Sequence, residues 1–185
     1  MTNRFNLKKT MQAVSAFLHF HGTKDMSYIR LLKLLYIADR ESIAATGHPI
    51  TGDKVVAMKH GPVLSGVYDL IKTGASVDWP QWTAHFQTTG YRIERIADPG
   101  VGSLSRFELG KIQELVDRYR EKGEWEIVEE THAFPEWVKN NPGDSSKPIP
   151  LGDILTALGC AENEEAIKRE AQSIADFDRL LAEVA

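Results

Sequence analysis

The chain has 185 residues, of which 26% are charged and 42% are hydrophobic, and its formal net charge is −4. A chain of this length buries roughly 70% of the surface that its unfolded form exposes, so it needs no metal or disulfide to hold one core together. The acidic balance argues against nucleic acid as the main partner. The single cysteine, Cys160, excludes an internal disulfide and fits a reducing cytoplasm.

The N-terminal residues 1–22 have a basic start but no long apolar run and no small-residue cleavage site. They therefore predict an amphipathic helix and no signal peptide. No stretch of the chain approaches the roughly 20 apolar residues that span a membrane. We expect a cytoplasmic protein without a membrane partner.

Apolar residues recur at three- and four-residue steps over residues 6–21, which predicts a helix with one buried stripe. Gly22 is expected to end this helix. Ser27 is a favourable N-cap for a second helix, because its hydroxyl can accept a hydrogen bond from an amide of the first turn. Gly47 is expected to close that helix before Pro49.

The second predicted helix is apolar on more than one face, so we expect it at the centre of the core. Its charged residues are predicted to give it a polar side, which consists of Lys33, Asp39, Arg40 and Glu41.

The segment after this helix begins with a predicted short strand of β-branched character over residues 54–59. A turn breaks the strand, and Pro62 within it suits the first position of a helix, where the missing amide hydrogen costs nothing. We therefore predict a helix from Pro62 to Lys72. An exposed strand edge over residues 54–63 is one candidate surface for pairing with another chain.

The middle of the chain predicts a small sheet followed by helices. Residues 91–96 alternate between apolar and polar, as in a strand with one packed face, and a second strand around residues 105–107 is expected to pair with it. Helices are predicted over residues 109–122 and 124–132.

The C-terminal part begins with residues 140–147, which are rich in turn formers and predict a linker. Helices are expected at residues 151–158 and 164–184. The last helix carries an apolar stripe at near-heptad steps, which consists of Ile167, Ala171, Ile174, Phe177, Leu181 and Val184.

Together these elements predict a mainly α fold with a small β element (α+β), in which a short two- or three-stranded sheet accompanies a helical core and C-terminal helices. We divide the chain into a helical domain (residues 1–140), a linker (141–150) and a C-terminal helical extension (151–185). The extension can pack on its own domain, or it can lay its stripe into a groove of a partner. The residues expected to make that contact are Ile167, Ile174, Phe177 and Leu181.

The sequence lacks the spacing of familiar catalytic and cofactor sites. Its six histidines form no HExxH pattern, and the chain has no CxxC, GxSxG or GxxxxGK[ST] motif. We therefore predict no metal, no cofactor and no enzyme activity. His60 at a strand–helix junction and His132 among acidic residues remain open as general bases, although tying a loop down by hydrogen bonding is the favoured role of each.

The most specific pattern lies in residues 28–72 and continues to Trp137. It combines a leucine-rich helix, a GHPITGD turn, an HGP turn and a later THAFPEW segment. In this combination the chain resembles the Panacea domain of SocA-like antitoxins, which also occurs in phage-associated GepA-like proteins. The motif residues that would hold the fold or bind a partner are Lys33, Tyr36, Asp39, Gly52, Asp53, His60, Gly61, Pro62, Tyr68, His132, Pro135 and Trp137.

The resemblance implies a mostly helical antitoxin that neutralises, by direct contact, a toxin protein encoded beside it. The domain is paired with many unrelated toxins, so the resemblance does not name the toxin, and it implies no catalytic residues. Two alternatives stay open: an adaptor that delivers its partner to a protease, and a histidine-dependent enzyme. A regulator that binds its own promoter is disfavoured by the acidic charge.

Overall fold

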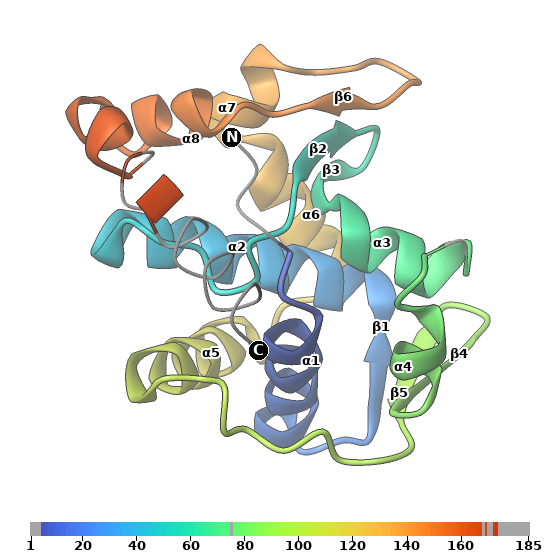
Figure 1. Cartoon of the computed structure of the whole chain (residues 1–185). Coiled ribbons are helices and arrows are strands. Elements are labelled where there is room, and N and C mark those ends of the chain that lie inside the picture. Colours follow the sequence, from blue (N-terminus) through green and yellow to red (C-terminus); the bar gives the residue numbers. More distant parts are fainter. Residues whose placement is uncertain (1–4, 75, 168, 170–171, 174–185) are drawn as a thin grey trace.

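A computed structural model describes residues 5–74, 76–167, 169 and 172–173 of the chain. Within these residues most of the secondary structure is helical, and the strands form two three-stranded antiparallel sheets. The predicted fold class, mainly α with a small β element, is therefore confirmed. Figure 1 shows helix α2 (Tyr28–Thr46) crossing the middle of the molecule, with α1 (Leu7–His21) and α5 (Arg106–Tyr119) on one side of it.

Helix α1 begins and ends where the sequence predicts. The Asn6 side chain accepts a hydrogen bond from the Lys9 amide at 3.0 Å and so caps the first turn. At the other end Gly22 has a φ of 84°, a left-handed conformation that glycine adopts without strain. The Gly22 amide donates to the His19 carbonyl at 3.0 Å, which closes the helix.

Helix α2 lies at the centre of the main hydrophobic core, as its apolar faces predict. Leu31, Leu34 and Leu35 are at most 1% exposed, and Gly47 ends the helix in a left-handed conformation. The predicted Ser27 cap is wrong in one respect. Ser27 occupies the N-cap position, but its buried hydroxyl makes no hydrogen bond, because Ser27 is also the last residue of a strand and its backbone follows the sheet.

The first sheet has the strand order β1 (Asp25–Ser27), β5 (Arg92–Arg95), β4 (Phe86–Thr89). It confirms the predicted strand over residues 91–96. The predicted partner strand around residues 105–107 is wrong, since β5 pairs with β1 and β4. Ser105 instead caps α5: its hydroxyl accepts from the Glu108 amide at 3.2 Å, and the Glu108 carboxylate accepts from the Ser105 amide at 2.8 Å.

The second sheet has the strand order β3 (Gly61–Leu64), β2 (Val55–Met58), β6 (Lys147–Pro148). The predicted helix start at Pro62 is wrong, because Pro62 lies in the edge strand β3, where proline is tolerated. Helix α3 (Ser65–Lys72) begins three residues later. The predicted free strand edge over residues 54–63 is also wrong, since β2 is paired on both sides and β3 is buried.

The remaining elements in the described residues are α4 (Trp79–Thr83), α6 (Glu124–His132), α7 (Pro135–Lys139), α8 (Leu151–Ala157) and a 3-10 helix (Ala161–Asn163). The helices predicted over residues 124–132 and 151–158 are confirmed, whereas the one predicted over residues 109–122 begins and ends three residues earlier. In Figure 1, α7, β6 and α8 lie on the side of α2 opposite to α1 and α5.

A second, smaller hydrophobic cluster joins the end of α2 to the C-terminal part of the chain. We call it the second cluster, and its buried members are Ile43, Ala57, Trp137, Ile149, Ile154, Leu155 and Ile167. Strand β6 pairs with β2 from within the segment predicted as a linker. Of the residues predicted to contact the domain or a partner, Ile167 belongs to this cluster, and Ile174, Phe177 and Leu181 lie outside the described residues.

Candidate functional site

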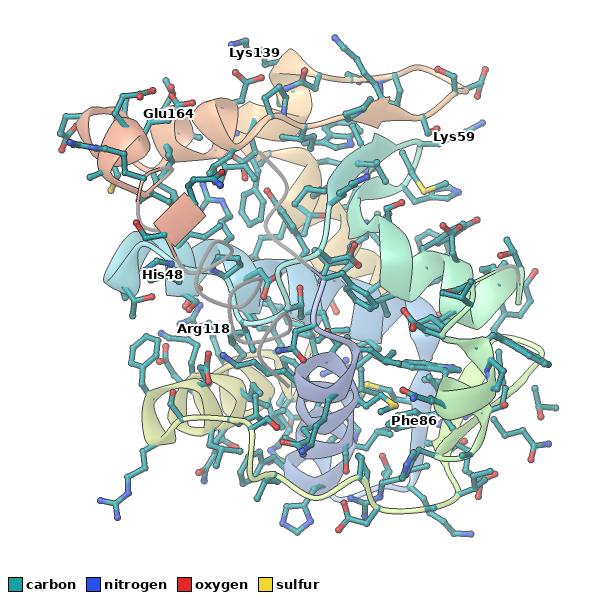
Figure 2. All side chains as sticks on the ribbon, viewed as in Figure 1. His48, Lys59, Phe86, Arg118, Lys139 and Glu164 are labelled. Carbon is teal, nitrogen blue, oxygen red and sulfur yellow. The ribbon has the colours of Figure 1, made fainter. Side chains whose placement is uncertain are left out.

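The motif residues gather around the hairpin formed by β2 and β3. This hairpin ends in an exposed tip at Lys59 and His60, where Figure 2 labels Lys59. Lys59 forms an ion pair with Asp144 at 2.8 Å across the tip. We use the name hairpin clasp for Gly61 and Pro62 of the hairpin together with the residues of α2, α6 and α7 that contact the hairpin, namely Lys33, Thr131, His132 and Trp137.

Lys33 holds the hairpin from α2. It is 1% exposed, and its amine donates a hydrogen bond to the Pro62 carbonyl at 2.9 Å. Removal from water disfavours the charged amine and lowers the pKa of Lys33 to about 7. The predicted polar side of α2 is therefore wrong for Lys33, and also for Asp39, which is 2% exposed. Both residues face partners that come from segments distant in the sequence.

Gly61 lies between Lys33 of α2 and Thr131 and His132 of α6. Its φ is +92°, and a Cβ atom at this position would lie 2.7 Å from Thr131 Oγ1 and 2.9 Å from Lys33 Nζ. Real Cβ atoms do not approach other atoms so closely. The HGP turn therefore needs glycine both for its backbone conformation and for the space it leaves.

Helices α6 and α7 hold the hairpin from the other side. The rings of His132 and Trp137 stack with their centroids 4.3 Å apart, and the Trp137 indole donates to the Met58 carbonyl at 3.1 Å. Burial lowers the pKa of His132, and the nearby Lys33 charge acts in the same direction. The neutral form of His132 is therefore favoured, as suits a ring stacked in the clasp.

Two aspartates hold backbone segments in place: Asp39 holds the turn before β2, and Asp53 holds the start of α3. Asp39 accepts hydrogen bonds from the amides of Ile50 at 2.9 Å and Thr51 at 3.0 Å, and burial raises its pKa to about 7. Asp53 accepts from the Gly66 amide at 2.9 Å in the first turn of α3. Burial also raises the pKa of Asp53. Both carboxylates are thus engaged in organising backbone.

Glu136 is a buried position that the sequence analysis did not include among the motif residues. It is 1% exposed, and it accepts hydrogen bonds from the Tyr36 hydroxyl at 2.6 Å and from Arg40 Nε at 2.7 Å. The Arg40 guanidinium also lies 4.4 Å from the centroid of the Phe134 ring. Glutamate is usually a surface residue, so the residue type alone does not predict that Glu136 is buried. Its position within the THAFPEW segment is the one feature of the sequence that points to it.

Four motif residues lie outside these contacts. Gly52 turns the chain with a φ of 69°, Pro135 opens α7, and Tyr68 packs half-buried against the main core. His60 is exposed at the hairpin tip, where its ring meets the edge of Trp125 at a centroid distance of 5.5 Å. Trp125 is 54% exposed. His60 and Trp125 therefore form an exposed aromatic pair beside the hairpin tip.

A cavity of about 470 Å³ lies where α2, β2 and α8 meet. Tyr36, Asp39 and Asp53 from the motif line it, and apolar residues of the C-terminal part form another wall. Its volume is in the range of roughly 300–1,000 Å³ found for ligand pockets. Within the part of the chain that the structure describes, no group of three or more His, Cys, Asp or Glu side chains could hold a metal ion.

The family model described as antitoxin SocA-like, Panacea domain, matches residues 31–138, which is more than half of the chain. The chain belongs to this family. The match extends over the whole hairpin clasp, so the Panacea domain contains every motif residue from Lys33 to Trp137. No curated protein and no solved structure matches the chain. None of the helices in the described residues combines the length and the hydrophobicity needed to cross a bilayer.

Proposed function

We propose that this protein is the antitoxin of a toxin–antitoxin pair and that it neutralises a toxin protein, encoded next to it, by direct contact in the cytoplasm. Membership of the SocA-like family supports the antitoxin role. One observation carries the binding mechanism: Lys33, Asp39 and Glu136 are buried and engaged in hydrogen bonds within the chain. Polar groups held in this way organise the scaffold of the domain.

We infer that the toxin contacts the exposed tip of the hairpin. His60 and Trp125 offer aromatic area there, and tryptophan is enriched among the residues that dominate binding energies. The hairpin clasp fixes the tip from both sides, so little conformational entropy would be lost when a partner binds.

Coexpression with the product of the neighbouring reading frame tests this contact. Trp125→Ala is expected to weaken toxin binding by about 30-fold, which corresponds to a hot-spot residue worth about 2 kcal/mol. Phe107→Ala is the matched control, because Phe107 is 41% exposed at the start of α5 and lies outside the tip. Affinity is measured by titrating labelled toxin with each purified variant.

Equal affinities of the two variants would show that the toxin binds elsewhere. Failure of the wild-type protein to form any complex with the neighbouring product, or to restore growth, would contradict the antitoxin role itself.

The same coexpression separates two alternatives. An adaptor for a protease would shorten the half-life of the toxin in pulse–chase measurements, whereas a blocking antitoxin would leave it unchanged or lengthen it. A histidine-dependent enzyme would keep toxin binding but lose neutralisation when His60 or His132 is changed to alanine. Membership of an antitoxin family favours a binding protein over an enzyme.

A further inference from the structure

Strand β4 is an edge of the first sheet. It pairs with β5, and among the strands that the structure describes none lies on its other side. Proteins usually protect such edges with lysine, proline or burial. The edges of the second sheet follow this rule, since β6 consists of Lys147 and Pro148 and β3 contains the buried Pro62. Strand β4 has the sequence FQTT, with neither charge nor proline, so its outer edge can accept another strand.

The hydrogen bonds of the first sheet show which backbone groups of β4 face outward. The Ile96 amide, directly after β5, donates to the His85 carbonyl at 2.9 Å, so His85 faces β5. Successive residues of a strand direct their amide and carbonyl groups to opposite sides. Gln87 therefore faces β5 as well, whereas the amides and carbonyls of Phe86 and Thr88 face away from it.

A pocket of about 370 Å³ opens along this outer edge, and we call it the edge pocket. Three successive residues of β4, Phe86, Gln87 and Thr88, line it. Their side chains point alternately to opposite faces of the sheet, so what they share toward the pocket is the edge of the strand. The end of α3 and helix α4 line it too, and Figure 1 shows both beside β4. Two lining residues, Trp79 and Ile96, are 43% and 51% exposed and offer apolar area to a partner.

The charge of the edge pocket indicates the chemistry of its occupant. Lys72 is the one charged residue among the described residues that line it. Its amine donates to the Tyr28 hydroxyl at 3.0 Å, and in the described part of the chain it forms no ion pair with a carboxylate. A segment that carries a carboxylate would supply the missing partner. A second copy of the chain suits the pocket less well, because a two-fold symmetric contact places the same surface, and the same lysine, on both sides.

We propose that an extended segment of the toxin adds a strand to β4, with an apolar side chain in the edge pocket and a carboxylate beside Lys72. Main-chain hydrogen bonds to Phe86 and Thr88 provide affinity, and the pocket provides specificity for the side chain that enters it. This inference rests on the proposed function and adds a second contact to the one at the hairpin tip.

Hydrogen exchange resolved by residue tests the added strand. It is measured by NMR on the full chain, with and without the product of the neighbouring reading frame. In the free protein the outward amide of Thr88 is expected to exchange faster than the amides of Gln87 and Thr89, which face β5. Added toxin should slow exchange at Thr88 by about tenfold or more and change its two neighbours little. A complex in which Thr88 exchanges as fast as in the free protein would overturn the proposal.

Thr88→Pro tests the same edge by affinity. It removes the outward amide without removing a hydrogen bond to β5, and proline is tolerated on the solvent side of an edge strand. We expect toxin affinity to fall about tenfold, as for the loss of one good hydrogen bond. Thr88→Val is the matched control, because it keeps the amide and the preference for a strand. Equal affinities of the two variants, each shown to be folded by its melting curve, would overturn the proposal, and the exchange measurement decides if Thr88→Pro does not fold.

Lys72→Glu tests the carboxylate. Reversing the charge at the edge pocket is expected to lower toxin affinity about threefold or more at low salt, and by less at high salt, where the interaction is screened. An affinity that does not change at either salt concentration would show that the toxin places no carboxylate there, which overturns the assigned chemistry of the occupant.

Other occupants give different results. If exchange at Thr88 slows without toxin as the protein concentration rises, a second copy pairs with β4 and the proposal is wrong. If the toxin binds but Thr88 responds in neither measurement, the toxin engages another surface; the proposal is then wrong while the antitoxin role stands. If the wild-type protein forms no complex with the neighbouring product, the antitoxin role fails and the proposal fails with it.

Discussion

Lys33 and Asp39 are oppositely charged residues of one helix, and burial shifts the two pKa values in opposite directions. It lowers the pKa of Lys33 from 10.5 to about 7 and raises the pKa of Asp39 from 3.8 to about 7. Between pH 7 and 10.5 the unfolded state keeps the Lys33 proton that the folded state has lost, so stability rises with pH. Between pH 3.8 and 7 the folded state keeps the Asp39 proton, so stability falls with pH.

Lys33→Met removes the titrating amine and keeps an unbranched side chain of similar shape. We expect the free energy of unfolding of the wild-type protein, relative to this variant, to rise by a few kcal/mol between pH 7 and 10, since each unit of pKa shift corresponds to about 1.4 kcal/mol. Urea unfolding at several pH values measures the difference. Curves for the two proteins that run parallel across this window would contradict the assignment.

The burial of these residues could not be predicted from the helix that carries them. Lys33 and Asp39 are charged, and the sequence predicts them on a polar side of α2 because such charges are rarely buried unless they are paired. Their partners are the Pro62 carbonyl and the amides of Ile50 and Thr51, which come from turns that no local pattern positions. Resemblance to the family identified Lys33 and Asp39 as important, but only the fold shows what they do.

At the scale of elements, the β2–β3 hairpin is organised by contacts from both sides. Pro62 misled the sequence reasoning because proline at the start of a helix and proline in an edge strand share a φ near −65° and both lack an amide hydrogen. The choice between them depends on the pairing of Ala57 with Pro62 and on the bond from Lys33. The bond from Lys33 joins residues 29 positions apart, far beyond the three- and four-residue steps that predicted α1.

Gly61→Ala tests whether the clasp leaves room for nothing larger than glycine. The new Cβ atom would meet Thr131 and Lys33, and the residue would keep a positive φ. We expect a loss of about 3 kcal/mol, of which about 1–2 kcal/mol is the left-handed backbone and the rest is crowding. Thermal or urea unfolding measures it.

Gly22→Ala is the control for this prediction. Gly22 has a similar φ of +84°, but nothing lies within 4 Å of its Cβ position, so only the backbone cost of about 1–2 kcal/mol should appear. Equal losses for the two variants would mean that the clasp is not closely packed around Gly61.

At the scale of the molecule, the mainly helical class and the strands β2 and β5 followed from local sequence patterns, but the pairing of the strands did not. Strand β5 pairs with β1, which lies about seventy residues earlier in the chain, and β2 pairs with β6, which lies about ninety residues later. Strand pairing over such separations is decided by the packed core, not by local preference. The second cluster likewise joins α2 to the C-terminal part, and the turn-rich composition of residues 140–147 gave no sign of it.

The central claim is that this protein neutralises its toxin by occupying it, and stoichiometry tests this most directly. Purified toxin is titrated with the purified protein, and the remaining toxin activity is plotted against the molar ratio. Binding predicts a loss of activity in proportion to the added protein, ending at a fixed stoichiometric ratio, with the complex recovered by size-exclusion chromatography. Complete neutralisation by a small fraction of that amount, with chemically altered toxin released, would contradict the account.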